Sequence, residues 1–463
     1  MDHYKLIFTL SLLFLCSTAF AIEIHVDFDS TRYAIDPMAW GINAFKATDP
    51  VHTENPQYLN GLRYLLGSGP KRGIVRVHTW EMMGNNEGSW LGNDAGGWNA
   101  AKAIRSIKAL IDDGFEVCIN IPAAPNDDNV QNKELFASSS AALVKHLNQT
   151  GHLDIRCWEV LNERDDVIAD PNLLADRYLA AHDSMIKVDG SIQIGGPAFQ
   201  HAYRTNYMNT FLDRCIDKMD FVSFHVYGGD GTVADELLWN SAGAGWLLSS
   251  VIAEVKKRSQ GRDIPVWHNE YNISWTWQTG IEQMKGMSGA IYDALVMARN
   301  LDLGARWLSA WNEQDGSYGK MDNNYLYRPA AHVFHLFNQY LKGNRVHTVS
   351  SKTDSVVVFA TRDSTRLQSI LMINKTMVAQ SIRINIKGEV GSRWNGWQLV
   401  NSEFQSLLNP SPLTLVGIPP MSVTVLVQGS DEIATGVLER IPGKSPVQKR
   451  INFDFLGRKS RLP

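Results

Sequence analysis

Eight short apolar runs alternate with longer amphipathic segments between Trp40 and about residue 342, and this alternation restricts the chain to few folds. Most of the runs are apolar in their first half and polar at their end, which is typical of parallel strands buried on both faces. The predicted strands cover residues 40–45, 74–80, 116–122, 157–163, 192–198, 221–227, 265–271 and 305–311.

Helical patterns separate these strands, and several of them end in Gly, as helix C-termini often do. Examples are residues 98–114, 133–149, 172–190 and 329–341. Eight strand–helix units predict an α/β fold, a (β/α)8 TIM barrel over residues 37–342. A doubly wound open sheet is the competing fold. It would need a Gly-rich phosphate-binding turn after its first strand, and residues 41–50 contain no such motif.

The pattern changes after residue 342, where short β-type runs are separated by turn residues. This predicts an accessory antiparallel β-sandwich over residues 343–430. Residues 22–36 include an alternating strand pattern, and we expect this N-terminal strand to join the sandwich. Residues 431–463 carry seven basic and four acidic side chains and read either as a sorting segment or as a mobile basic tail.

Residues 1–21 have the three parts of a secretory signal peptide: a lysine, an apolar run and a small-residue A-x-A ending. The apolar run is too short to span a bilayer, and no later stretch is long enough for an integral membrane segment. We therefore expect cleavage near Ala21 and a secreted protein, which would be extracellular, periplasmic or on the cell surface. The mature chain would have 463 − 21 = 442 residues.

The charge and cysteine content exclude several other classes. With 44 basic and 48 acidic side chains the net charge is only −4, which argues against nucleic acid as a partner. After cleavage three cysteines remain, too few and too scattered for a disulfide framework. No C-x-x-C or H-E-x-x-H spacing suggests a metal site, and we expect no cofactor. The oligomeric state is left open.

Polar side chains stand at the ends of the predicted strands, where a (β/α)8 barrel carries its chemistry. They are Arg76, His78, Asn162, Glu163, His225, Tyr227 and Glu270, with Asn312 just beyond the last strand. The two carboxylates are 107 residues apart and would face each other across the barrel mouth. Such a pair is what glycoside hydrolysis requires, with one carboxylic acid to protonate the leaving oxygen and one carboxylate to attack or to activate water.

The neighbouring side chains suit this chemistry. Asn162 could donate a hydrogen bond to a sugar hydroxyl, and Arg76 would keep a nearby carboxylate ionised. His225 and Tyr227 would orient the nucleophile by hydrogen bonding. Glu159 lies inside its strand, four residues before Glu163, and is interpreted as a buried partner for a cation such as Arg76. Glu81, Glu313 and Asp315, which lie in loops, rank lower.

The motifs WEVLNE (158–163) and HNEY (268–271) resemble the acid/base and nucleophile motifs of clan A glycoside hydrolases, the retaining (β/α)8 enzymes. Within the clan the chain most resembles glycoside hydrolase family 39, which includes β-xylosidases and α-L-iduronidases. The resemblance spans most of residues 22–430 and is carried by WEVLNE (158–163), HNEYNIS (268–274), VRVH (75–78), IGGPA (194–198), DFVSFHVYG (220–228) and RPAAHVFHLFNQYLKGNRV (328–346).

The resemblance implies that Glu163 is the general acid/base and Glu270 the nucleophile. It also implies that an aromatic residue on the last strand forms the floor of the sugar site, and Trp311 is nearest the mouth. Family members usually have Pro after the acid/base and Thr before the nucleophile, whereas this chain has Arg164 and Asn269. A related family of the same clan therefore stays open.

The sequence thus predicts a secreted retaining enzyme that cleaves a plant or algal oligo- or polysaccharide, with a β-xylosidase type as first guess. The alternatives are an endo-acting clan A polysaccharide hydrolase and a non-catalytic carbohydrate-binding protein. Seven of the 14 tryptophans are candidates for stacking on sugar faces, which favours a substrate longer than one sugar. They are Trp80, Trp90, Trp239, Trp275, Trp277, Trp307 and Trp311.

Overall fold

The computed structural model describes residues 21–67, 73–79, 89–125, 127–242, 245–365, 367–388, 393–407 and 416–428. The predicted signal peptide up to residue 20 and the whole basic tail therefore lie outside the described residues. No helix in the described part of the chain is long and apolar enough to cross a membrane.

Eight parallel strands close into a barrel and follow one another around it in chain order, which confirms the predicted fold. They are β2 (Trp40–Asn43), β3 (Ile74–His78), β4 (Glu116–Ile121), β5 (Cys157–Val160), β6 (Gln193–Phe199), β7 (Val222–His225), β8 (Val266–Tyr271) and β9 (Trp307–Ala310). Each lies within one of the predicted runs or extends it by one residue. The apolar run forms the buried strand, and the polar residue that follows it lies at the C-terminal mouth of the barrel.

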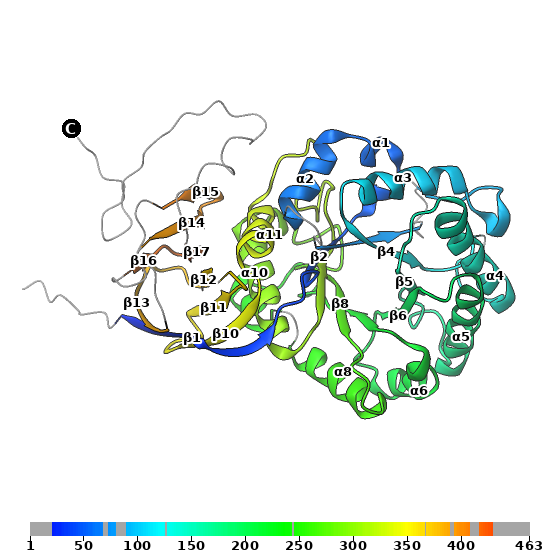
Figure 1. Ribbon diagram of the computed structural model, residues 1–463. Helices are drawn as coiled ribbons and strands as arrows, with labels where there is room; N and C mark the ends of the chain where they lie inside the picture. The colour runs from blue at the N-terminus through cyan, green and yellow to red at the C-terminus, as the bar shows by residue number, and fades with distance from the viewer. Residues whose placement is uncertain are drawn as a thin grey trace, which may run out of the picture.

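The helices surround the barrel as an outer ring (Figure 1). They are α1 (Pro50–Thr53), α2 (Pro56–Leu66), α3 (Ala100–Asp112), α4 (Lys133–Val144), α5 (Pro171–Val188), α6 (Thr205–Cys215), α7 (Asp235–Ser241), α8 (Gly245–Arg258), α9 (Ile281–Lys285), α10 (Met287–Leu303) and α11 (Pro329–Tyr340). Local sequence sets their ends. The Asp170 side chain caps α5 with Pro171 in its first turn, and Gly304 ends α10 with a φ of 107°.

A second domain of nine strands lies beside the barrel, next to α10 and α11 (Figure 1). Its strands are β1 (Ile22–Ala34), β10 (Asn344–Ser350), β11 (Val356–Arg362), β12 (Gln368–Asn374), β13 (Gln380–Lys387), β14 (Trp394–Val400), β15 (Glu403–Ser406), β16 (Val416–Ile418) and β17 (Ser422–Gln428). The N-terminal strand joins this domain as expected, because β1 pairs antiparallel with β10 and parallel with β13. That parallel pair makes the otherwise antiparallel sheet mixed.

The nine strands form one continuous hydrogen-bonded sheet. One face encloses the domain's own core, in which Ile24 and Phe28 of β1 pack with Ile370 of β12. On the other face the neighbouring Leu371 belongs to the barrel's core, as the two-residue period of a strand requires. The sandwich predicted from sequence is thus one sheet, curved around a core and docked on the barrel by its other face.

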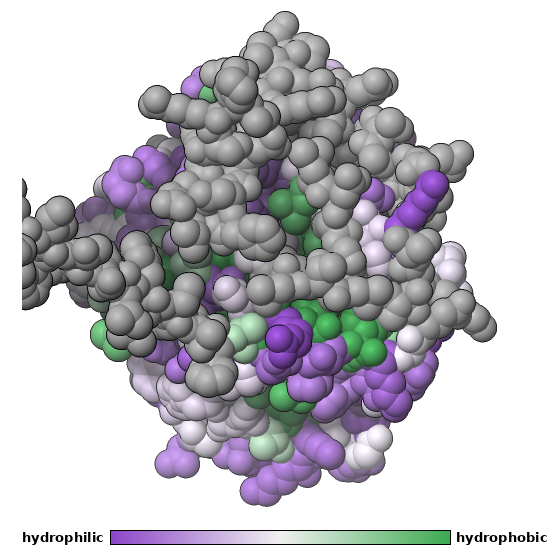
Figure 2. All heavy atoms as spheres, turned by 90° about the vertical axis from the view of Figure 1, so that its left-hand side faces the viewer, coloured by the Kyte–Doolittle hydropathy of each residue, from purple (hydrophilic) through white to green (hydrophobic). Residues whose placement is uncertain are grey.

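On the side of the molecule that carries the β-domain, the side chains coloured in Figure 2 are mostly hydrophilic or intermediate, with hydrophobic patches between them. The three cysteines that follow the predicted cleavage site are free thiols, with Cys118 and Cys215 buried and Cys157 partly buried. Stability of the described structure therefore comes from its large cores.

Candidate active site

A fully buried arginine, Arg76 on β3, is the hub of the polar cluster at the barrel mouth. Its Nε lies 2.6 Å from Oε2 of Glu159, its Nη1 lies 2.8 Å from Oε1 of Glu270, and its Nη2 lies 2.7 Å from Oδ1 of Asn162. Two carboxylates thus offset the cost of burying one guanidinium. The predicted pairing of Arg76 with Glu159 is confirmed.

Glu270 lies on β8 and is held from several directions. The Tyr227 hydroxyl donates to its Oε2 at 2.8 Å, and Nε2 of His225 lies 3.4 Å from its Oε1. Burial alone would raise the pKa of Glu270, but the charges of His225 and Arg76 lower it far below the ordinary carboxylate value. Burial and the nearby carboxylates raise the pKa of Tyr227, so it remains a hydrogen-bond donor. Glu270 is therefore an ionised carboxylate at any ordinary pH.

Glu163 lies just beyond β5, where the backbone turns sharply. Leu161 and Glu163 both have left-handed backbone angles, with φ values of 75° and 54°, an uncommon conformation that costs energy in residues other than Gly. The turn is held in place because the Glu163 amide donates to the Ala198 carbonyl at 3.0 Å. The turn directs the side chain into the mouth, where Oε1 lies 2.7 Å from Nδ1 of His225.

The two glutamates meet across His225. One oxygen of each carboxylate and one nitrogen of His225 all lie within 4.8 Å of one another. Burial lowers the pKa of His225, but the charge of Glu270 and the hydrogen bond to Glu163 raise it above its usual value. The environments of the carboxylates differ, since the Glu163 side chain is 26% exposed and that of Glu270 only 7%. Glu163 is thus the carboxylate that water reaches more easily.

The same three side chains are a geometrically possible metal site. A metal ion bound to the Glu270 carboxylate would lie next to the buried guanidinium of Arg76, whose Nη1 is 2.8 Å from Oε1 of Glu270. Like charges at such a distance repel strongly in a buried site. We therefore assign the cluster no metal ion.

His78 and Trp311 complete the predicted set. Nη1 of Arg76 donates to Nε2 of His78 at 2.7 Å, and burial together with the charge of Arg76 lowers the pKa of this histidine. The Trp311 ring, half-buried after β9, meets the His78 ring edge-on at 5.3 Å and lies 6.0 Å from the ring of Phe45. All eight side chains predicted for the site are therefore connected in one cluster.

Three asparagines that we did not predict hold this cluster together. Asn43 accepts a hydrogen bond from Nη1 of Arg76 at 2.7 Å, and Asn120 and Asn269 donate to Glu159 at 2.8 and 2.5 Å. All three are fully buried. Asn43 and Asn120 are polar residues inside otherwise apolar runs, as Arg76 is, so treating every run in the same way would have found them.

The two departures from the family pattern both have local roles. Asn269 replaces the usual Thr and bonds to Glu159, as described above. Arg164 replaces the usual Pro, is buried, and donates to the carbonyls of Asn162 and Asp128. It therefore ties the turn that carries Glu163 to the loop after β4.

The tryptophans divide into two groups. Trp90 and Trp239 are buried in the barrel's core, and Trp307 packs edge-on against Trp267, so these three are not available for sugar stacking. Loop and helix packing buries Trp90 and Trp239, and Trp307 on β9 packs inside the barrel against Phe221 and Trp267, none of which the sequence pattern revealed. Trp275 and Trp277 are 65% and 61% exposed, on the loop after β8. With Trp311 they remain candidates, and Trp80 lies outside the described residues.

A comparison with protein families decides the class of this site. Residues 157–386 match the model described as Glycosyl hydrolases family 39. The chain is a glycoside hydrolase whose residues 157–386 are similar to family 39. The matched range begins at β5, contains Glu163 and Glu270, and extends into the β-domain as far as β13.

Solved structures similar to this glycoside hydrolase share its fold. CelM2, a bifunctional glucanase-xylanase from a metagenome library, has a TM-score of 0.64 at 15% identity, covering 88% of this chain and 99% of that chain. An α-L-arabinofuranosidase from Thermotoga maritima has a TM-score of 0.67 at 12% identity, covering 88% and 100%. A monomeric beta-xylosidase from Caulobacter crescentus CB15 has a TM-score of 0.61 at 15% identity, covering 88% and 99%. No curated protein sequence matches the chain.

Proposed function

We propose that this glycoside hydrolase retains the anomeric configuration of its substrate and works by double displacement. The observation that carries the proposal is the approach of the Glu163 and Glu270 carboxylates to within 4.8 Å. Retaining enzymes place the two groups about 5–5.5 Å apart, whereas inverting enzymes need about 6.5–9.5 Å to admit a water molecule. The spacing leaves room for a sugar carbon to be attacked directly.

In the first step a carboxylate oxygen of Glu270 attacks the anomeric carbon. The bond to the leaving oxygen breaks, and Glu163 gives that oxygen its proton, which leaves a glycosyl ester on Glu270 and an ionised Glu163. In the second step Glu163 takes a proton from water, and the resulting hydroxide attacks the same carbon. The ester bond breaks, Glu270 is released as a carboxylate, and Glu163 is protonated again.

The surrounding side chains support these roles. Arg76 and Tyr227 hold both oxygens of Glu270, and the charge of Arg76 keeps it ionised, so that it has no proton to donate and is available as the nucleophile. Oδ1 of Asn162 accepts from Arg76, which turns its amide nitrogen toward the substrate as a donor to a sugar hydroxyl. His225, between the two carboxylates, can accept or release a proton as the charge on Glu163 changes.

The test is the anomer that forms first. Proton NMR during hydrolysis of an aryl glycoside should show a product with the configuration of the substrate, before mutarotation sets in. Initial appearance of the opposite anomer would refute double displacement.

For the substrate we propose a plant or algal oligo- or polysaccharide, with a β-xyloside as the first candidate. The resemblance to family 39 supports this choice, and the similar structures include proteins described as a xylanase and a xylosidase. Endo-action on a polysaccharide is the second candidate, and the exposed Trp275 and Trp277 rings favour it. Product analysis over aryl glycosides and xylo-, gluco- and arabino-oligosaccharides would separate the two.

Replacing Trp275 or Trp277 by Ala should raise KM for oligosaccharides by about threefold to tenfold, since stacking of one aromatic ring is worth about 0.5–1.5 kcal/mol. KM for a monosaccharide aryl glycoside should stay unchanged, because a single sugar sits at the glutamates. Trp246→Ala is the matched control, as Trp246 is 68% exposed but lies on the outer helix α8. An equal effect of all three variants on both substrates would exclude a substrate-stacking role.

Export is part of the same proposal and rests on the sequence of residues 1–21 alone. Mass spectrometry of the mature protein should find Ile22 as its first residue.

A further inference from the structure

A charged cavity lies between the barrel and the β-domain, away from the glutamates. Its volume is about 560 Å³, and it is lined by α10 on one side and by β10, β11 and the loop between them on the other. None of its lining residues belongs to the candidate active site. Four cationic side chains and two carboxylates face it: Arg32, Arg299, Arg345, Lys375, Asp302 and Asp354.

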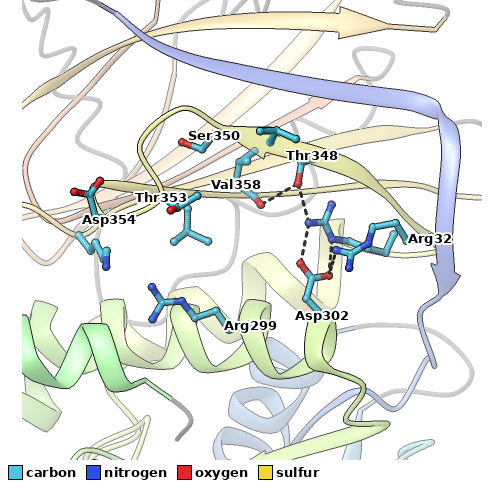
Figure 3. Close-up of a pocket in the computed structure, with 12 residues that line it drawn as sticks. Arg32, Arg299, Asp302, Thr348, Ser350, Thr353, Asp354 and Val358 are labelled. Carbon is cyan, nitrogen blue, oxygen red and sulfur yellow. Dashed lines mark hydrogen bonds and ion pairs between the residues drawn. The ribbon is translucent and has the colours of Figure 1, made fainter. Parts of the chain in front are cut away.

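One end of the cavity is internally paired. Asp302 receives two contacts of 3.0 Å from Arg345 and lies 3.0 Å from Nη1 of Arg32. The Tyr33 hydroxyl also donates to Asp302, at 2.6 Å. Arg345 donates in addition to Thr348 at 2.8 Å. The contacts of Asp302 with the lining arginines are drawn at the right of Figure 3, and together with the bond from Tyr33 they connect the two domains at this end of the cavity.

The opposite end holds two cations without a counter-ion among the described residues. Nη1 of Arg299 donates to the Trp239 carbonyl at 2.5 Å, and Nζ of Lys375 donates to Oδ1 of Asn240 at 2.7 Å. Both partners are neutral, and in the described part of the chain no carboxylate oxygen lies within the 4.0 Å of an ion pair from either cation. Lys375 is only 6% exposed.

Such an arrangement is costly unless an anion completes it. Burial lowers the pKa of both Arg299 and Lys375, the charge of Arg299 lowers that of Lys375 further, and the charge of Asp354 offsets this lowering only in part. Asp354 lies on the loop above them and is solvent-exposed; Figure 3 draws no contact between it and Arg299. With four cations and two carboxylates, the lining carries a net charge of 4 − 2 = +2.

We propose that this cavity binds an oxyanion between Arg299 and Lys375. Guanidinium and ammonium groups give the charge-assisted hydrogen bonds that sulfate, phosphate and carboxylate oxygens accept. Ser350 at the end of β10 and Thr353 on the loop that follows lie at the same end of the cavity and offer hydroxyl donors (Figure 3). The ligand is either a free inorganic oxyanion or the acidic group of a saccharide, since both present the same oxygen atoms and the volume admits more than a single ion.

Calorimetric titration of the full-length protein tests the proposal, with sodium sulfate, sodium phosphate and a galacturonic acid trimer as probes and sodium chloride holding the ionic strength constant. Wild-type protein should bind at least one probe saturably. Arg299→Gln and Lys375→Gln should each weaken that binding by about tenfold or more, because each removes a charged donor. Lys257→Gln, an equal change of charge at an exposed position on α8, should leave it unchanged.

If Arg299→Gln and Lys375→Gln fail to fold, the Asp354→Asn variant still tests the proposal. Asp354 is exposed, and its removal should tighten binding by taking a carboxylate away from the cavity. Sulfate or phosphate binding alone would identify a free anion, and trimer binding would identify a saccharide site. Absence of saturable binding by every probe, or unchanged affinity in Lys375→Gln and Asp354→Asn, would overturn the proposal. The Glu270→Gln protein should bind the probes as wild type does, so this result is independent of the catalytic mechanism.

Discussion

Replacing Glu270 by Gln is expected to lower kcat by roughly 10⁴-fold or more, the scale on which loss of a covalent nucleophile acts in other enzymes. The amide has nearly the same shape as the carboxylate, so the hydrogen bond from Tyr227 can persist while the attacking charge disappears. Substrate binding should change little. The measurement is kcat and KM on an aryl glycoside. Intact-mass analysis should find a glycosyl ester on Glu270 in the wild type and none in the variant.

A second variant controls for general damage. Glu282→Gln removes an equal charge from a side chain that is 92% exposed, on α9 outside the cluster, and its kcat should equal that of wild type. Thermal unfolding should show that Glu270→Gln is folded. If the folded Glu270→Gln enzyme kept more than about a tenth of wild-type kcat, Glu270 could not be the nucleophile.

Replacing Glu163 by Gln should lower kcat by roughly 10²–10⁴-fold, the usual contribution of a general acid or base. The loss should be largest for substrates with poor leaving groups, which need a proton, and smaller for an activated aryl glycoside. Rates on glycosides of graded leaving-group pKa would show this dependence.

Azide offers an independent readout of the same residue. A small anion can replace water once Glu163 no longer activates it, so azide should accelerate the Glu163→Gln enzyme and yield a glycosyl azide of retained configuration. Azide should have no such effect on Glu270→Gln, in which no ester forms. Equal losses for activated and unactivated substrates, with no azide product, would contradict the acid/base role.

The barrel could be predicted because two independent patterns agree. Strands buried on both faces are largely apolar, and the polar residues toward their ends lie at the mouth. Glu163, Glu270 and His225 stand near the ends of such runs, and Arg76 is the polar residue inside another. The β-domain strands were equally visible, because their alternation is a local property of the sequence.

Contacts between segments that are far apart in the sequence could not be predicted from it. Glu313 was ranked as a loop residue, yet it is fully buried and accepts from the Phe45 and Lys46 amides at 2.8 and 2.7 Å. Burial raises its pKa to about 7, against the lowering effect of these hydrogen bonds. Trp90 and Trp239 were predicted to stack on sugars because their burial, too, depends on contacts between distant segments. The packing that buries them joins segments of the chain that no periodicity connects.

The pairing of β1 with β10 and β13 determines when the β-domain can finish folding during synthesis of the chain. Ile24 is opposite Ser350 on one side, and Ile22 is opposite Ile382 on the other. A ribosome therefore makes this strand first and its neighbours more than three hundred residues later. Until then both edges of this strand, which is apolar on one face, are without partners, a state that favours aggregation and slows folding. The β-domain is thus completed only when β10 and β13 pair with the N-terminal strand, and a chain interrupted before β13 would leave one edge of β1 unpaired.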